Sequence, residues 1–408
     1  MAVRHGYGKI AGADALVFAY DTGDTYNSYK GEPTVNIIDG GSNVAKAITG
    51  CFQFGNHASS NGSETANVDF SNTYAKRKNV LRVTNTNGIG YSMINQRMSS
   101  NATSGTSYTY SFDYKVLAYD GGTWTPTVGV YGDGYKVPNS SYTGTNYAYQ
   151  YRPLPDGWIR FVFTYTADYA GRNTYRSNMN TNDTTPFDIL FDNFQIEENS
   201  HVTPFTTGTR SATQGLLDLT GNRSIDLGNV NFDSNARKIF DGTDDTIEIT
   251  TATEIIDSDY TVETVVKKDT TGVQEGILSD YQYSWWIFKI TSANKAYIVH
   301  KWNNSTPVAV TGATTIGTDY THITVTFSKT DGMKLYVNGE LDGTNSSTLP
   351  FILAGRGPRY IGHLREGAPG SPASFFNGQI PVLKISTGAL TAQEVRNNFN
   401  FYKGRFGI

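Results

Sequence analysis

The stretch FFNGQIPVLKISTGALTAQEVRNNFNF, residues 375–401, decides the fold of the C-terminal half of the chain. Its apolar run Ile380–Ile385 is rich in β-branched residues and predicts a buried strand. Thr391 and Glu394 have the spacing of a capping box, in which the hydroxyl caps the helix and the carboxylate reaches back to the cap. The stretch therefore predicts a strand, a turn and a short capped helix that ends near Phe399.

Two more motifs lie upstream of this ending. Phe240–Asp245 precedes the predicted strand Thr246–Thr250, and Leu335–Glu340 predicts a strand that enters a hairpin. The hairpin pair Asn338 and Gly339 suits a type I′ turn, because both residues tolerate positive φ. In this order the three motifs resemble the laminin-G-like, concanavalin A-like lectin/glucanase family. The resemblance implies an antiparallel sandwich but no particular ligand, because such sandwiches carry many functions.

Composition favours an all-β protein. Aromatic residues make up 13% of the 408 residues, with 27 Tyr and 42 Gly, and few long stretches have helical periodicity. The net charge of −4 argues against a nucleic-acid partner. Cys51 is the single cysteine, so no intramolecular disulfide can form. No run approaches the ~20 apolar residues of a membrane span, so we expect no membrane insertion.

The apolar run Leu16–Tyr20 has the length of a strand and needs a sheet to dock on. The motif Ser28–Gly31 follows it, and Asp218–Asn222 reads Asp-Leu-Thr-Gly-Asn. These motifs resemble the opening of lectin-like phage virion proteins, where the second follows soon after the first. The resemblance implies that the C-terminal sandwich is discontinuous and takes its first strand from Ala13–Tyr20. Packing of that strand on the inserted domain or on a partner chain remains the alternative.

The region between these motifs has its own strand patterns. Tyr108–Tyr119 alternates aromatic with polar residues and predicts a half-buried antiparallel strand. Gly157–Thr166 repeats the pattern, and Ile189–Glu197 predicts the closing strand. The Gly-Trp-x-Arg strand and the Phe-Asp-Asn-Phe-Gln-Ile-Glu strand resemble jelly-roll carbohydrate-binding modules.

We therefore expect an all-β chain of two antiparallel β-sandwiches, a jelly roll inserted into a concanavalin A-like sandwich, with one short C-terminal helix. The expected parts are an N-terminal tail, a first strand segment of the lectin-like sandwich, the inserted module, a linker and the main sandwich. Their boundaries are 1–12, 13–34, 35–200, 201–212 and 213–408.

The sequence gives no sign of a catalytic site. Glucanases of the lectin-like group carry paired acids in a Glu-x-Asp-x-x-Glu run, which alternation places on one face of a strand. No such run is present, and Glu248, Glu263 and Asp331 are single acids that we expect on solvated faces. The six histidines are scattered without metal-ligand spacing. We expect that the protein is not an enzyme.

No cofactor is expected with certainty, but the resemblance to jelly-roll modules implies a structural Ca²⁺. Asp192 on the closing strand is the matching ligand. Calcium needs several oxygens, and hydrogen bonding of Asp192 to nearby backbone N–H groups is the alternative. Asp241, Asp244 and Asp245 fit either a turn or a cation site, and we favour the turn.

Sugar recognition needs flat aromatic faces beside polar groups. The loop-like segment Trp124–Tyr151 is richer in aromatic residues than a solvated loop requires, and a second aromatic group contains Trp302. Packing of these rings on the sheet or on a neighbouring subunit is the alternative. The glycan-binding candidates are Trp124, Tyr131, Tyr135, Tyr147, Tyr149 and Trp302.

We expect a bacteriophage virion surface protein, either a capsid decoration or a tail or fibre component, with a glycan-binding role in host adhesion. This expectation rests on the resemblance of the opening motifs, of Thr203–Ser211 and of the ending Lys403–Ile408 to phage structural proteins. Its partners would be other virion proteins and host surface polysaccharide. The N-terminus lacks the apolar core of a signal peptide, which fits assembly in the host cytoplasm. The alternative function is a glycan-degrading or glycan-binding enzyme accessory module.

Overall fold

The computed structural model describes residues 15–38, 53–54, 67–74, 77–85, 93–131, 135–136, 147–167, 174–178, 186–233, 238–249, 257–280, 286–301, 306–351, 359–366 and 371–408. The predicted tail, residues 1–12, and the candidate Trp302 lie outside these ranges. The described residues form two compact units. Unit 1 contains residues 15–33, Ser211–Asp233 and 238–408, and unit 2 contains the described part of Thr34–Arg210.

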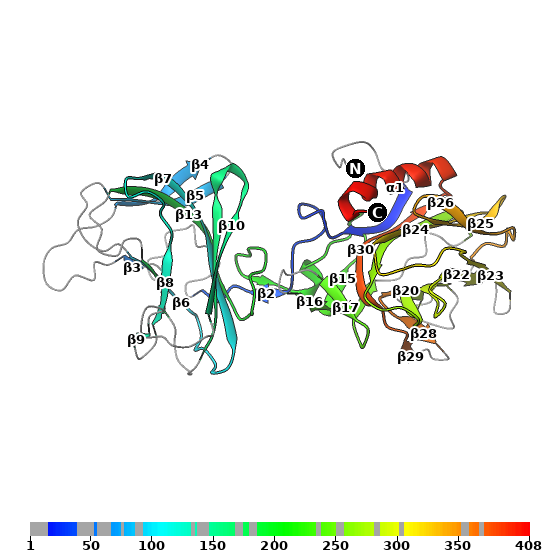
Figure 1. Cartoon of the computed structure of the whole chain (residues 1–408), viewed down its shortest axis with the longest axis horizontal. Coiled ribbons are helices and arrows are strands. Elements are labelled where there is room, and N and C mark those ends of the chain that lie inside the picture. Colours follow the sequence, from blue (N-terminus) through cyan, green and yellow to red (C-terminus); the bar gives the residue numbers. More distant parts are fainter. Residues whose placement is uncertain are drawn as a thin grey trace, which may run out of the picture. The chain divides into compact units, whose positions relative to one another are not determined.

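Unit 1 is a sandwich of two antiparallel sheets (Figure 1). In spatial order the first sheet contains β16 (Asn231–Phe232), β17 (Lys238–Asp241), β30 (Asn377–Thr387), β19 (Tyr260–Lys268), β24 (Thr321–Ser328), β25 (Gly332–Val337) and β26 (Glu340–Asn345), with β1 (Leu16–Asp21) also paired to β30. The second sheet contains β15 (Ile225–Asn229), β18 (Thr246–Ile249), β27 (Arg359–Ile361), β20 (Glu275–Asp280), β21 (Trp286–Ile290), β22 (Ala296–Lys301) and β23 (Pro307–Thr311). A small separate ribbon pairs β28 (Leu364–Glu366) with β29 (Ser371–Ala373).

The two sheets enclose one apolar core to which both contribute alternate residues, such as Val262 and Leu383 from the first and Phe288 and Ile298 from the second. The predicted hairpin turn has the expected backbone: Asn338 and Gly339 have φ of 49° and 80°, as a type I′ turn requires. The predicted all-β architecture of antiparallel sandwiches is confirmed.

The first strand completes the sheet around β30. β1 pairs antiparallel with β30, with Phe18 opposite Ile385 and Asp21 opposite Val382. β17 pairs with the earlier part of the same edge, at Asn377 and Gly378. The phenol of Tyr20, which is fully buried, donates a hydrogen bond to the carbonyl of Ile380 at 2.9 Å.

Asp218 of the Asp-Leu-Thr-Gly-Asn motif holds the other side of β1. Its carboxylate accepts the backbone N–H of Ala19 at 3.0 Å and those of Thr220, Asn222 and Arg223 at 3.0–3.2 Å. The N–H of Leu219 donates to the carbonyl of Ala19 at 2.8 Å. Asp218 is buried, so this one side chain joins two segments that lie about 200 residues apart in the sequence.

Helix α1 (Ala392–Phe406) covers the outer face of the first sheet (Figure 1). The predicted capping box is present, with Thr391 and Glu394 each satisfying the other's backbone N–H. The helix continues past the predicted end at Phe399 and stops at Gly407, whose φ of 71° closes it in the left-handed conformation. Tyr402 packs on Val265 and Val382 of the sheet. No helix in the described ranges has the length and apolar character to cross a membrane.

Unit 2 contains two larger antiparallel sheets and a two-stranded ribbon. The six-stranded sheet contains β10 (Tyr147–Pro153), β11 (Ile159–Thr166), β7 (Ser107–Tyr119), β13 (Phe187–Glu197), β5 (Arg77–Asn85) and β4 (Asn67–Tyr74). The five-stranded sheet contains β3 (Gln53–Phe54), β6 (Met93–Arg97), β12 (Thr174–Asn178), β8 (Thr127–Tyr131) and β9 (Tyr135–Lys136). The ribbon pairs β2 (Thr34–Val35) with β14 (Thr209–Arg210).

The part of β7 from Tyr108 to Tyr114 is buried on both faces, which corrects the prediction of a half-buried strand there. Its aromatic residues enter the core of unit 2, as the alternation predicts. Thr109, Ser111 and Asp113 on the other face are also at most 1% exposed. Residues 201–212, which we predicted as a linker, belong in part to unit 2. Thr203 and Arg210 are buried, and residues up to Arg210 belong to unit 2.

We expect Asp218→Ala to lower the free energy of unfolding by about 2 kcal/mol or more, because it leaves several buried N–H groups without an acceptor. Urea unfolding followed by circular dichroism measures the loss. The matched control is Asp226→Ala, because Asp226 is exposed and its carboxylate accepts a single N–H, that of Gly228, among the described residues. Equal losses in the two variants would contradict the role assigned to Asp218.

Candidate functional site

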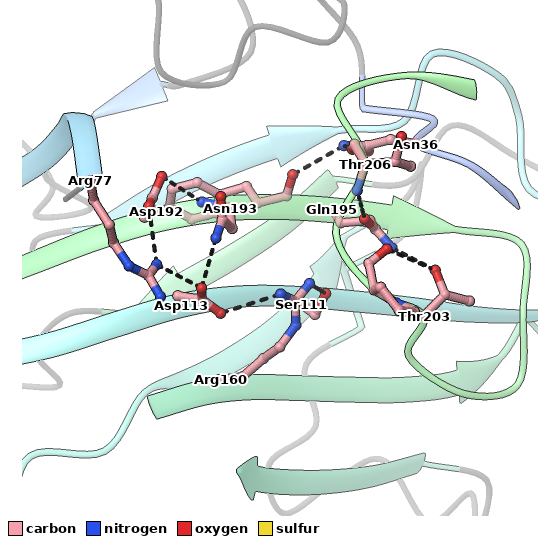
Figure 2. Close-up of polar contacts among 12 residues, drawn as sticks. Asn36, Arg77, Ser111, Asp113, Arg160, Asp192, Asn193, Gln195, Thr203 and Thr206 are labelled. Carbon is pink, nitrogen blue, oxygen red and sulfur yellow. Dashed lines mark hydrogen bonds and ion pairs between the residues drawn. The ribbon is translucent and has the colours of Figure 1, made fainter. Parts of the chain in front are cut away.

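A buried polar network crosses the face of the six-stranded sheet that lies opposite the aromatic core (Figure 2). Its centre is Asp113, whose Oδ2 accepts Nη1 of Arg77 at 2.7 Å and Nδ2 of Asn193 at 2.8 Å. Nη1 of Arg160 lies 3.3 Å from the other carboxylate oxygen, and Nη2 of Arg160 donates to Ser111 at 3.0 Å. Two guanidinium groups thus neutralise one buried carboxylate, as buried charges require.

Asp192, the predicted calcium ligand, belongs to the same network. Its Oδ2 lies 3.0 Å from Nη1 of Arg77, and its Oδ1 accepts the backbone N–H of Asn193 at 2.9 Å. Asn193 has φ of 52° at a bulge in β13, which turns its amide towards Asp113. Burial raises the pKa of Asp192, and Arg77 opposes that shift. Arg77 is therefore the cationic partner of Asp192 in this structure, and calcium binding there stays a prediction.

The network continues to the chain that follows β13. Nε2 of Gln195 donates to the hydroxyl of Thr203 at 3.1 Å, and Oε1 of Gln195 accepts the N–H of Thr206 at 2.8 Å. Nδ2 of Asn36 donates to the carbonyls of Phe194 and Thr206, both at 3.1 Å (Figure 2). These hydrogen bonds hold Asn36, Thr203 and Thr206 against β13 of the six-stranded sheet, so we assign this network a structural role.

A second buried cluster lies beneath α1 in unit 1 and corrects the prediction for Glu263. That carboxylate is 3% exposed, not solvated, because α1 covers it. It accepts Nε2 of His322 at 2.8 Å and Nδ2 of Asn398 at 3.1 Å, and Nζ of Lys384 lies 3.8 Å away. Burial alone would raise the pKa of Glu263, but Lys384 and the bonds from His322 and Asn398 outweigh it and lower the pKa. The cluster docks the helix on the sheet.

Because the folded state lowers the pKa of Glu263, its contribution to stability is full above the unfolded pKa of about 4.3 and is lost as pH falls through the folded value. We expect Glu263→Gln to lower the free energy of unfolding at pH 7 by about 3 kcal/mol. The difference from wild type should shrink when urea unfolding is repeated towards pH 3.

The control for this prediction is Glu340→Gln, which removes the exposed pair of Glu340 with Arg396 and should cost less than about 1 kcal/mol. A Glu263→Gln deficit that stayed constant from pH 7 to pH 3 would contradict the assignment.

Asp241, Asp244 and Asp245 have carboxylate oxygens within 4.8 Å of one another. Asp245 is buried and accepts the N–H of Asp241 at 2.6 Å and of Asn231 at 3.1 Å. Burial, with the negative charges of Asp241 and Asp244, raises the pKa of Asp245 to about 6. The backbone bonds describe a turn stabilised by Asp245. Cation binding at this turn stays the alternative to that prediction.

The five-stranded sheet of unit 2 carries two of the predicted glycan-binding residues side by side. Tyr131 of β8 lies directly opposite Tyr135 of β9, and on its other side Tyr131 lies opposite Thr174 of β12. Thr174 in turn lies opposite Arg97 of β6. Residues opposite one another on paired strands share a face of the sheet, so these four positions form one row across four strands.

The other candidate residues lie elsewhere. Trp124 is 7% exposed, and its ring meets Tyr114 edge-on at 5.2 Å in the core of unit 2. Tyr149 is half-buried and packs on Phe163 with ring centroids 5.2 Å apart. Tyr147 lies two residues before Tyr149 on β10, opposite Tyr165. The register therefore groups Tyr131 and Tyr135 and separates the β10 tyrosines from them, and the sequence did not reveal Arg97 as their neighbour.

Residues 241–396 match the family model described as the concanavalin A-like lectin/glucanases superfamily. No curated protein matches the chain. Among solved structures, the chain is similar to the CBM40 of the Ruminococcus gnavus IT-sialidase bound to alpha2,3 sialyllactose, with 17% identity and a TM-score of 0.31 over 34% of this chain and 81% of that one.

The chain is also similar to the receptor binding domain of botulinum neurotoxin D, with 15% identity and a TM-score of 0.37. That match covers 47% of this chain and 51% of the toxin domain. The residues matched by the family model, 241–396, extend from the end of β17 into α1, so the similarity to the concanavalin A-like lectin/glucanases superfamily lies within unit 1.

Proposed function

We propose that this chain is a glycan-binding protein of a bacteriophage particle, a capsid decoration or a component of the tail or fibre. The glycan-binding part is supported by the lectin-like domain in unit 1 and by the composition of one sheet face in unit 2. The phage part is supported by the resemblance of Ser28–Gly31, Asp218–Asn222 and the C-terminal Lys403–Ile408 to phage structural proteins.

The observation that carries the proposal is that Tyr131 and Tyr135 stand directly opposite each other on the paired strands β8 and β9. Sugar rings offer apolar C–H faces, which aromatic rings complement, and hydroxyl groups, which amides bind. The same face contains three amide residues by register: Gln53, Asn95 and Asn178. Aromatic and amide residues together are the combination that a glycan requires.

We further propose that unit 2 is a module inserted into the lectin-like sandwich. Lys30 and Gly31 donate their N–H groups to the carbonyl of Gly215 within unit 1, and Thr34 pairs with Arg210 within unit 2. The chain therefore leaves unit 1 and returns to it at hydrogen-bonded neighbours. Unit 1 would attach to other virion proteins, and the particle would be assembled in the host cytoplasm.

The proposed role is not catalytic, because the sequence contains no run of paired acids of the glucanase type. A glycan-degrading enzyme or an enzyme accessory module is the alternative. Release of reducing ends from host surface polysaccharide by the purified protein would favour the enzyme.

We expect Tyr131→Ala and Tyr135→Ala each to weaken glycan binding about tenfold, which corresponds to ~1.4 kcal/mol, because each removes an aromatic face. An array of bacterial surface polysaccharides identifies the ligand, and affinity electrophoresis measures the variants. The matched control is Tyr26→Ala, because Tyr26 is 84% exposed and belongs to unit 1.

Binding that survives both substitutions would remove the sheet face from the proposal, and an array without signal at high protein concentration would remove glycan binding. The phage role is tested separately by mass spectrometry of purified particles from a lysate, in which the chain should be present at stoichiometric amounts.

A further inference from the structure

His363 lies between β27 and β28 in unit 1 and is 1% exposed. Its ring lies beside those of Tyr360 and Phe375, at centroid distances of 5.0 and 5.5 Å. Neither ring nitrogen has a hydrogen-bond partner among the described residues. A protonated imidazole here would bury a charge and two N–H donors without an acceptor, which costs more than burying the neutral ring. The surroundings of His363 therefore favour its neutral form.

The described charged groups around this imidazole do not favour its protonation. Burial, with the cationic Arg365 of β28, lowers the pKa of the imidazole to about 4. The two acids of the neighbouring strand β20 interact with other cations: Glu275 pairs with Lys268 at 3.0 Å, and the charge of Asp280 acts on Arg359 of β27. Among the described side chains, a proton on the ring therefore has no carboxylate to stabilise it.

The other two described histidines of unit 1 are equally buried but have partners. Nε2 of His322 lies 2.8 Å from the carboxylate of Glu263. The two ring nitrogens of His300 bond the phenol of Tyr260 at 2.7 Å and the carbonyl of Leu349 at 2.9 Å. Burial lowers the pKa of His300 to about 4 as well, so an experiment has to separate these two rings.

Backbone contacts hold the segment around His363 on the second sheet of unit 1. The N–H of Gly362 donates to the carbonyl of Ile277 at 3.1 Å, and the hydroxyl of Ser279 donates to the carbonyl of His363 at 3.0 Å. A Cβ atom at Gly276 would lie 2.4 Å from the carbonyl carbon of His363. The segment therefore packs directly on the backbone of β20.

Leu364, the next residue, packs on apolar side chains of the same sheet. It is fully buried and forms a small cluster with Ile287 of β21 and Val299 of β22, which are 6% and 7% exposed. These two residues lie opposite each other and alternate with core residues of their strands, so they face away from the core. Release of the segment would uncover them.

We propose that the segment Gly362–Arg365 is an acid-sensitive latch of unit 1: protonation of His363 releases the segment from the second sheet and uncovers Ile287 and Val299. This inference goes beyond the proposed function and does not depend on glycan binding. In the released segment the imidazole has its ordinary pKa of about 6.5, whereas the docked one stays neutral down to about pH 4. The latch is therefore fully stable above pH 6.5 and weakens as the pH falls from 6.5 to about 4.

Amide hydrogen exchange of the full chain at pH 7 and pH 5 tests the latch. The reporters are the N–H of Gly362, bonded to Ile277, and the N–H of Phe376, which donates to the carbonyl of Gly362 at 2.7 Å. After correction for the intrinsic pH dependence of exchange, we expect their protection to fall roughly thirtyfold, because at pH 5 the released imidazole is protonated and the docked one is not. The N–H of Ile37, bonded to the carbonyl of Ile196 in unit 2, is the internal control and should keep its protection.

His363→Phe keeps an aromatic ring beside Tyr360 and Phe375 but removes the titrating group, so protection of Gly362 should be equal at the two pH values. The matched control is His300→Phe, because His300 is fully buried in the same sheet. In that variant the fall at Gly362 should persist. Binding of a hydrophobic dye should rise from pH 7 to pH 5 in the wild type and not in His363→Phe, because the released segment uncovers apolar side chains.

A fall in the protection of Gly362 that persists in His363→Phe would overturn the latch. An equal fall at Ile37 would also overturn it, because the whole chain and not one segment would then open. If His363→Phe does not fold, the imidazole signal of wild-type His363 is titrated by NMR. A pKa near 4 with the thirtyfold fall at Gly362 would support the latch, and a pKa of 6.5 or higher would overturn it.

Discussion

Two strands, β17 and β1, pair with the same edge of β30, and the first sheet of unit 1 depends on both pairings. β17 takes the residues around Gly378, and β1 takes those from Val382 to Ser386. Without β1, the backbone groups on that stretch would lose their partners, and each buried unsatisfied group costs about 1–3 kcal/mol. Asp21 at the end of β1 also pairs with Arg405 of α1 at 2.7 Å, so the same strand helps to hold the helix.

Three buried carboxylates fix tertiary contacts within the two units, Asp218 and Glu263 in unit 1 and Asp113 in unit 2. Asp218 accepts a backbone N–H from β1. Asp113 binds two guanidinium groups and one side-chain amide. Glu263 accepts hydrogen bonds from side chains of β24 and α1. Each takes its partners from segments that are distant in the sequence. A buried charge tolerates only packings that supply its donors, because removing a partner leaves it uncompensated. The carboxylates therefore connect long-range segments in a way that apolar contacts alone do not.

Local sequence patterns predicted the secondary-structure elements. They missed the burial of residues that are covered by segments distant in the sequence. The capping box at Thr391 and the turn at Asn338 depend on neighbouring residues alone, and both are present. Glu263 alternates with apolar residues like a solvated position, yet α1 arrives from about 130 residues away to bury it. Trp124 likewise looks like a loop aromatic until the core of unit 2 surrounds it.

The residues of the candidate site also differ in how far the sequence reveals them. Tyr131 and Tyr135 stand out because they are aromatic residues close together in a polar segment. Arg97 carries no such local signal, because only the pairing of β6 with β12 and of β12 with β8 brings it into the row of Tyr131 and Tyr135. Strand register is a property of the folded sheet and cannot be read from one sequence.

The position of β1 in the sequence has a consequence for biosynthesis. Tyr20 leaves the ribosome before its partner Ile380, which lies 360 residues later. At translation rates of 5–20 residues per second, the strand waits roughly 20–70 s for its edge. Throughout that interval unit 2 can complete its own sheets while β1 is still an unpaired apolar segment, open to association with other nascent chains. Cellular holdases that shield the N-terminal segment would therefore govern the yield of native protein more strongly than factors acting on the finished sandwiches.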